Sequence, residues 1–93
     1  MLTLSTREPG VNELADPERF RDFYTAALPR VYGYFAHRLG GDTALAEDLT
    51  QDTFLAAVRE LRRGASVTEP MPWLLGIARH KWLDHLRRQQ RTG

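Results

Sequence analysis

The sequence predicts an all-α fold, a compact bundle of three principal helices. Apolar residues recur at three- and four-residue spacing in three separate stretches. No stretch alternates apolar with polar residues for long enough to form a β-strand. Gly40-Gly41, Gly64 and a proline pair near residue 70 divide the stretches from one another. The 93 residues suffice for one small domain, which should bury roughly 60–65% of the surface that its unfolded chain exposes.

The first stretch predicts a helix that begins after a short tail. Residues 1–15 have no helical period and contain Pro9-Gly10, so we expect a mobile tail there and a helical domain over residues 16–93. Asp16-Pro17-Glu18 supplies a capping carboxylate, a proline for the first turn and an acid at the positive end of the helix dipole. The buried stripe is predicted as Phe20, Phe23, Ala27, Val31, Tyr34 or Phe35, and Leu39.

Three glycine and proline signals set the other boundaries. Pro29 lies inside the first helix, so we expect a kink or a break near residues 26–29, which would give four helices in place of three. After Gly40-Gly41, Asp42 should cap a second helix that runs to about Arg62 or Arg63. Residues 63–72 are rich in Gly, Ser, Thr and Pro and predict a loop. A third helix should run from Pro72 to about Gln90, with Leu74, Leu75, Ala78, Trp82 and Leu86 toward the core.

Composition excludes several classes of protein. The chain has no Cys, and therefore no disulfide framework and no thiolate metal site. No run approaches the ~18 apolar residues of a spanning helix, and the first residues lack the pattern of a signal peptide. Net charge is only +1, but residues 1–58 carry five basic and nine acidic side chains, whereas residues 59–93 carry eight and three. This asymmetry indicates a polyanion partner for the C-terminal part, or a solvated basic face.

The second helix has an unusual outer face. Its inner sector is built mainly of small residues, which permit close packing: Ala46, Leu49, Thr50, Thr53, Ala56, Ala57 and Leu61. The opposite sector mixes acids with apolar residues, as protein-binding surfaces do: Asp48, Gln51, Asp52, Leu55, Val58 and Arg59, with Phe54 at the margin. A docking surface explains this mixture. Packing of Phe54 and Leu55 under the N-terminal tail or a neighbouring helix explains it equally well.

The third helix carries a second face suited to nucleic acid. That face holds Trp73, Gly76, Ile77, His80, Lys81, Asp84, Arg87 and Arg88. Its Arg and Lys side chains could contact phosphates, which gives affinity but little sequence information. An exposed Trp73 could stack on an unpaired base; the alternative is a helix-start residue covered by the loop. Trp82 falls on the core side and is expected to be structural.

Two motifs in order carry a resemblance to a known family. "ALAEDLTQDTFLAAVREL" followed by "PWLLGIARHKWLDHLRR" is similar to the second conserved region of bacterial RNA polymerase sigma factors of the extracytoplasmic-function group. The likeness covers about Phe20 to Arg91. In that family the D-L-x-Q-[DE]-x-F helix docks on the coiled coil of the polymerase β′ subunit. The resemblance implies a core-binding set of Asp48, Gln51, Asp52, Phe54, Leu55 and Val58.

The same resemblance implies contact with promoter DNA. The third helix and the preceding loop of the family read the −10 element, largely as non-template single strand, and the loop captures an extruded base. The implied DNA-binding set is Arg62, Arg63, Ser66, Thr68, Glu69, Trp73, Ile77, His80, Lys81, Asp84, Arg87 and Arg88. Two departures prevent transfer of base preference. Many relatives have Asn in place of His80, and Met71-Pro72 replaces a commoner aromatic-containing lead-in to the Trp.

The sequence fits three other classes of protein less well. An enzyme is disfavoured because His80 and His85 do not share a helix face, and no nucleophile–base pair, phosphate loop or metal-ligand spacing is present. We therefore expect no catalysis, no cofactor and no metal. A helical protein-interaction module without DNA contact would leave the basic C-terminal helix unexplained. A duplex-reading helix-turn-helix protein would need a turn of about 3–4 residues in place of the longer loop.

The resemblance also sets expectations for the surroundings of the domain. Sigma factors of this group carry a second helical domain that reads the −35 element, and this chain lacks it. We expect a region-two fragment that works in the cytoplasm with RNA polymerase core and promoter DNA. An anti-sigma factor is an expected partner by the same resemblance, and no membrane insertion is expected.

Overall fold

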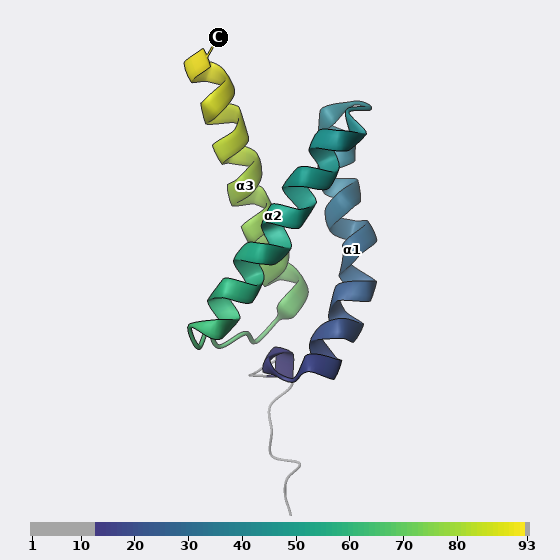
Figure 1. The fold of residues 1–93 in the computed structure, drawn as a ribbon, viewed down its shortest axis with the longest axis vertical. Coiled ribbons are helices and arrows are strands. Elements are labelled where there is room, and N and C mark those ends of the chain that lie inside the picture. Colours follow the sequence, from purple (N-terminus) through teal and green to yellow (C-terminus); the bar gives the residue numbers. More distant parts are fainter. Residues whose placement is uncertain (1–12, 93) are drawn as a thin grey trace, which may run out of the picture.

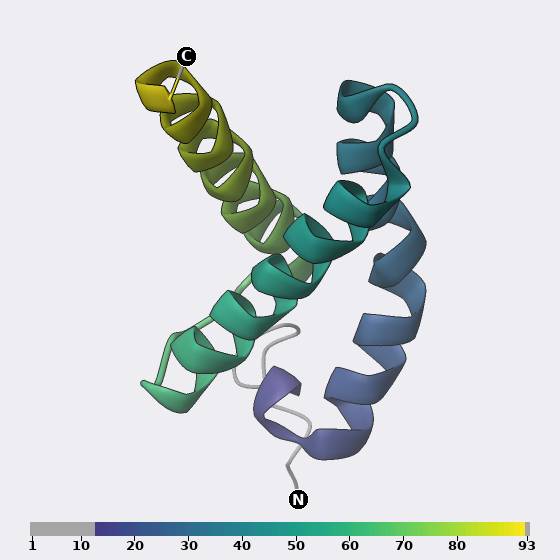
Figure 2. The same ribbon diagram turned by 45° about the horizontal axis from the view of Figure 1, so that its top comes forward.

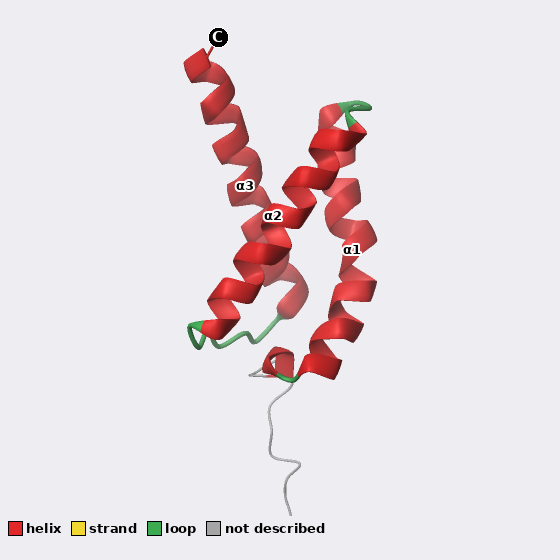
Figure 3. Cartoon of the chain, viewed as in Figure 1, coloured by secondary structure: helices red, strands yellow, loops and turns green. Residues whose placement is uncertain are grey.

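The computed structural model describes residues 13–92, and the predicted tail over residues 1–12 lies outside them. Four helical elements follow in order: η2 (Glu13–Ala15), α1 (Pro17–Leu39), α2 (Thr43–Arg62) and α3 (Pro70–Thr92). The three long helices run up, down and up again, and the described chain is helix and loop throughout (Figures 1 and 3). The predicted all-α bundle of three principal helices is confirmed.

The short helix η2 corrects the predicted end of the tail. Residues 13–15 form a turn of 3-10 helix, and Leu14 is 6% exposed. Leu14 shares a surface pocket with Phe20 of α1 and with Val58 and Leu61 of α2. The sequence shows no helical period here, because a single turn is too short to reveal one. Burial of one leucine is what fixes this turn.

Helix α1 begins and ends where the sequence predicts. Asp16 adopts an extended conformation, and its Oδ1 accepts a hydrogen bond from the Glu18 N–H at 3.2 Å, as an N-cap does. At the other end Gly40 has φ 61°, and its N–H donates to the Ala36 carbonyl at 3.1 Å. A side chain at that left-handed φ is strained, whereas glycine adopts it at little cost.

The predicted break at Pro29 is wrong, because α1 continues through it (Figure 1). Proline removes one N–H from the helix ladder and leaves the carbonyl four residues earlier, that of Thr25, without its usual donor. Both Pro29 and Thr25 are exposed, so the affected carbonyl lies on the solvent side of the helix. Water can satisfy it there, and packing of the opposite side holds the helix together.

Helix α2 has a well-formed cap at each end. Oδ1 of Asp42 accepts from the Leu45 N–H at 3.1 Å. At the C-terminus the Ala65 N–H donates to the Glu60 carbonyl at 3.0 Å, and the Gly64 N–H donates to the Leu61 carbonyl at 3.0 Å. With Gly64 at φ 91°, these two bonds make a Schellman motif. The predicted end of the helix at Arg62 or Arg63 is confirmed.

Helix α3 begins two residues earlier than predicted, at Pro70 in place of Pro72. The Trp73 N–H donates to the Glu69 carbonyl at 3.1 Å, which closes the first turn. Both prolines fall in that turn, where no N–H is needed for the helix ladder. The second proline is therefore compatible with helix and does not mark its start.

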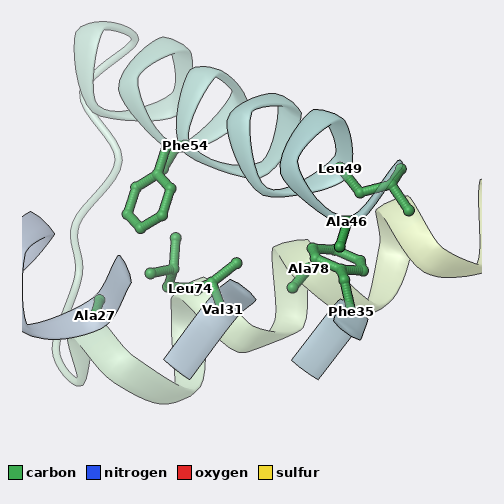
Figure 4. Packing of buried hydrophobic residues seen from close by; sticks show 9 residues of the cluster. Ala27, Val31, Phe35, Ala46, Leu49, Phe54, Leu74 and Ala78 are labelled. Carbon is green, nitrogen blue, oxygen red and sulfur yellow. The ribbon is translucent and has the colours of Figure 1, made fainter. Parts of the chain in front are cut away.

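The core lies where the three long helices cross (Figure 4). Its fully buried members come from all three helices, among them Val31, Phe35, Thr53 and Leu74. Thr50 and Thr53 are buried polar residues, and their hydroxyls donate to the Ala46 and Leu49 carbonyls at 2.7 and 2.8 Å. These bonds satisfy the hydroxyls inside the helix, so two threonines can replace larger apolar residues at a close helix contact.

The C-terminal half of α3 diverges from the other two helices (Figures 1 and 2). Leu74 and Ala78 are buried, whereas Trp82 and Leu86, which the helical period also assigns to the core, are only half-buried. Trp82 and Leu86 do lie on the side of α3 that the helical period predicts, but α2 no longer covers that part of α3. The divergence leaves the last turns of α3 open on most sides.

Candidate functional site

The outer face of α2 carries the first candidate site. Asp48, Gln51 and Asp52 are exposed, and Leu55 is 54% exposed, although it is a large apolar residue. Val58 is half-buried one turn further along the helix. These five residues therefore share one side of α2, as their spacing predicts. We call this set the outer face of α2.

Phe54 does not belong to that face, and its predicted position as an outward anchor is wrong. The side chain is 6% exposed and points from α2 into the interior toward Leu74 and Val31 (Figure 4). Its ring also meets the ring of Tyr24 edge-on, with centroids 4.7 Å apart. A residue at the margin of two helical sectors becomes buried or exposed according to where the neighbouring helix lies. Here α1 lies on the Phe54 side.

The structure adds Tyr24 and Leu28 of α1, which the predicted buried stripe did not include, and places Phe20 of that stripe with them. A pocket of about 310 Å³ between α1 and α2 is lined by Phe20, Tyr24 and Leu28 together with Gln51, Leu55 and Val58, among others. Tyr24 is 38% exposed. The signal was present in the sequence, because Tyr24 and Leu28 follow Phe20 at intervals of four residues and form a second apolar row beside the rest of the stripe. The outer face of α2 and this row make one composite surface, the α1–α2 face.

The second candidate site lies between α2 and α3. A pocket of about 410 Å³ is lined by Trp73, Gly76, Ile77, His80, Lys81 and Asp84 from α3, and by Ala56 and Glu60 from α2. The structure thus brings together five of the residues predicted to contact DNA, and we call this the α2–α3 pocket. Its apolar floor and charged rim combine a surface for ring stacking with groups for polar contact.

Glu60 is a residue that sequence reasoning missed. Its Oε1 accepts a hydrogen bond from the indole Nε1–H of Trp73 at 3.2 Å, which links α2 to α3 across the intervening loop. Trp73 is half-buried and packs against the core, so its state lies between the two alternatives left open by the sequence, an exposed indole and a covered one. An acid in the last turn of a helix interacts unfavourably with the negative end of the helix dipole. The presence of Glu60 at this position was therefore the signal in the sequence that could have singled it out.

Arg87 and Asp84 form an ion pair one turn apart on α3. A hydrogen bond from the Arg87 guanidinium, helped by the charges of Arg87, Lys81 and Arg88, holds the pKa of Asp84 below its ordinary value. Both side chains are largely exposed, at 66% for Arg87 and 45% for Asp84. The pair therefore adds little to folding, but it offsets one positive charge on the predicted DNA face.

The predicted DNA-binding residues outside α3 lie on the loop and at the end of α2. Ser66, Thr68 and Glu69 are exposed on the loop, whereas Val67 between them is 2% exposed and anchors the loop to the core. Arg63 is exposed at the end of α2. Arg62 instead lines the pocket beside η2, together with Leu14 and Val58. The structure thus does not place Arg62 with the residues of the α2–α3 pocket.

The described residues show neither a metal-binding cluster nor a membrane-spanning helix. Within residues 13–92, no three His, Asp or Glu side chains gather where they could hold a metal ion. None of the helices in this range combines the length and the apolar composition that a bilayer span requires. The residues that line the first candidate site are mixed acidic and apolar, and those of the second include aromatic and basic side chains.

Comparison with known proteins assigns this three-helix bundle to a family of transcription initiation factors. Residues 23–92 match the Sigma-70 region 2 family, and the chain belongs to it. Members of this family are initiation factors and not enzymes, which confirms the prediction that the chain is not an enzyme.

Curated relatives support the same family. The chain is 41% identical over 73 residues to RNA polymerase sigma factor CarQ of Myxococcus xanthus, a stretch that covers 78% of this chain and 41% of that protein. It is 46% identical over 65 residues to ECF RNA polymerase sigma factor SigC of Mycobacterium tuberculosis, which covers 70% and 34%. ECF RNA polymerase sigma factor SigF of Caulobacter vibrioides is 31% identical over 75 residues, covering 81% and 42%.

These relatives are longer proteins. The matched stretch of this chain spans less than half of the length of each of the three. No solved structure gave a significant match.

Proposed function

We propose that this domain docks on RNA polymerase core, on the coiled coil of the β′ subunit, and contacts the promoter −10 element as the duplex opens. The observation that carries this proposal is the placement of the two surfaces. The α1–α2 face and the α2–α3 pocket lie on different flanks of α2, so one domain can hold protein and DNA at once. Membership of the Sigma-70 region 2 family supports both partners.

The α1–α2 face is suited to a protein partner. Leu55 and Tyr24 offer exposed apolar surface, and Asp48, Gln51 and Asp52 surround it with polar groups. A central apolar anchor within a polar rim is the usual build of a protein interface. The excess of carboxylates favours a partner surface that carries basic side chains.

The α2–α3 pocket and the loop are suited to opened DNA. Trp73 and Ile77 supply apolar surface for a base, and Lys81, Arg87 and Arg88 supply charge for phosphates. The exposed loop residues Ser66, Thr68 and Glu69 supply hydrogen-bonding groups on the segment between α2 and α3. We propose the cytoplasm as the site of action, because the domain would work there with RNA polymerase. An anti-sigma factor that covers either surface is a proposed regulator, on the resemblance to the extracytoplasmic-function group alone.

Docking is tested by reconstituting the chain with polymerase core. Asp48→Asn combined with Leu55→Ala should weaken core binding by about 2 kcal/mol or more, the effect of a truncated interface anchor. Asp22→Asn is the charge-matched control, because Asp22 is exposed on α1 and lies outside the α1–α2 face as defined. Core binding that is equal in the double variant and in the control would contradict the proposal. Helix content of all variants should be unchanged.

Loop reading is tested in the same reconstituted system with opened promoter templates. Substitution of Ser66, Thr68 or Glu69 by Ala should change preference at one or two promoter positions and leave core binding intact. By the sigma-factor resemblance, His80 lies where the family meets the upstream duplex edge of the −10 element. His80→Asn should therefore shift preference at that edge and leave single-strand binding unchanged. Competition among templates that differ at one base separates these outcomes. A uniform loss at all positions for every loop variant would show that the loop supports the fold and reads no base.

A further inference from the structure

The hydrogen bond between Glu60 and Trp73 joins two elements that the proposed function uses separately. Its partners are 13 residues apart, one in the last turn of α2 and one in the first turn of α3. The bond closes the base of the loop that lies between them. It also ties the indole Nε1–H of Trp73 to a side chain of α2.

Both partners are held in place by their own backbones. The Glu60 carbonyl accepts from the Ala65 N–H at 3.0 Å in the Schellman motif, and the Trp73 N–H donates to the Glu69 carbonyl at 3.1 Å. The backbones of both residues are therefore ordered, and the bond between their side chains costs only side-chain rotamer freedom. The bond is part-buried, where competition from water is reduced.

The position of Glu60 is otherwise unfavourable. Residues 59–93 contain three acids, and two of them, Glu60 and Asp84, line the α2–α3 pocket. Asp84 is paired with Arg87. A carboxylate beside a phosphate-binding face costs affinity for DNA, and an acid near a helix C-terminus also opposes the dipole. The hydrogen bond to the Trp73 indole accounts for a carboxylate at this position.

We propose that Glu60 is a positioning residue of the nucleic-acid interface, whose carboxylate holds the Trp73 indole as a fixed wall of the α2–α3 pocket. The inference rests on the proposed function of that pocket. Trp73 packs against the core and also lines the pocket, so a fixed indole presents a ready surface to a base. A stacking surface that is ordered beforehand binds without the cost of ordering it on contact.

The first test observes the indole in the free 93-residue chain. Trp73 and Trp82 each give one indole N–H signal in a ¹⁵N-resolved NMR spectrum, and Trp82→Phe assigns them. In Glu60→Ala the Trp73 signal should move and its hydrogen should exchange faster with solvent. In Glu60→Gln, which keeps an acceptor oxygen, both properties should stay near those of the parent chain. A Trp73 signal that is unchanged in Glu60→Ala would overturn the inference.

The second test measures binding of an opened promoter template by the chain reconstituted with polymerase core. Glu60→Ala should bind about fivefold more weakly than Glu60→Gln, the effect expected for one hydrogen bond when the charge is equal, and Glu60→Gln should bind at least as tightly as the parent. In a Trp73→Phe background, which lacks the N–H, Glu60→Ala should have no such effect. If Glu60 acts only by repelling phosphates, Ala and Gln tighten binding equally, and that result would overturn the inference.

The two tests also separate this inference from the proposed function. A parent chain that binds neither polymerase core nor opened DNA would contradict the proposed function. The NMR comparison would still decide whether Glu60 holds the indole. Conversely, parent binding that is weakened by Trp73→Ala but equal in Glu60→Ala and Glu60→Gln would keep the proposed function and reject the role of Glu60. Equal melting temperatures among the Glu60 variants would exclude a loss of fold as the cause.

Discussion

Neighbouring residues of α2 have opposite roles. Phe54 is 6% exposed and packs on Tyr24, whereas Leu55 next to it is 54% exposed. Consecutive residues of a helix point about 100° apart, so a helix packed on one flank buries one and exposes the other. The apolar character of Phe54 and Leu55 therefore does not show which of the two is buried and which is exposed.

This difference gives a paired prediction. Phe54→Ala should destabilise the domain by about 3–5 kcal/mol, because it leaves a cavity beside Leu74 and Val31. Leu55→Ala should change stability by no more than about 0.5 kcal/mol and should instead weaken binding to polymerase core. Thermal unfolding measured beside core binding checks both. A Phe54→Ala chain that unfolds like the parent would show that the ring is not part of the core.

The ion pair on α3 gives a second prediction at this scale. Asp84→Asn should release Arg87 for phosphate contact, and therefore tighten DNA binding and steepen its dependence on salt. Because the pKa of Asp84 is lowered in the folded chain, its contribution to stability is present at neutral pH and is lost as the pH falls through that lowered pKa. Salt titration of template binding at neutral pH is the measurement. An unchanged salt slope would place Arg87 away from the DNA.

At the scale of the element, glycine decides how α2 ends and the loop begins. Gly64 has φ 91°, so Gly64→Ala should destabilise the domain by about 1–2 kcal/mol through backbone strain alone, since an added Cβ meets no atom within 4 Å. Gly33→Ala is the matched control. Its added Cβ is equally free of contacts, and inside α1 it should stabilise by about 0.5–1 kcal/mol. Chemical denaturation of both variants gives the two free energies, and equal signs would contradict this account.

At the scale of the whole molecule, the division of charge along the chain becomes a division between faces. The acidic residues of the α1–α2 face and the basic residues of α3 lie on different flanks of α2. Arg87→Ala and Arg88→Ala should therefore weaken template binding at all sequences, each lowering the salt slope by somewhat under one counterion, and leave core binding unchanged. Asp48→Asn should affect core binding alone. Variants of one face that alter both activities equally would show that the faces are not independent.

The sequence by itself determined the three helices, their caps and the sides that face the core. These features depend on local chemistry: Asp16 and Asp42 cap, Gly40 and Gly64 adopt left-handed backbone, and apolar residues follow the helical period. The outward direction of Asp48, Gln51, Asp52 and Leu55 was predicted for the same reason. The family resemblance rested on the same residues and is confirmed by the match over residues 23–92.

Only the tertiary structure decided what depends on a neighbouring element. The position of α1 buries Phe54 and leaves Tyr24 at the rim, and the divergence of α3 leaves Trp82 half-exposed although its period is that of a core residue. The link between Glu60 and Trp73 depends on where two helix ends meet across a loop. A helical period fixes only a direction around the helix axis. Burial in that direction depends on whether another segment lies there, and residues far apart in sequence determine it.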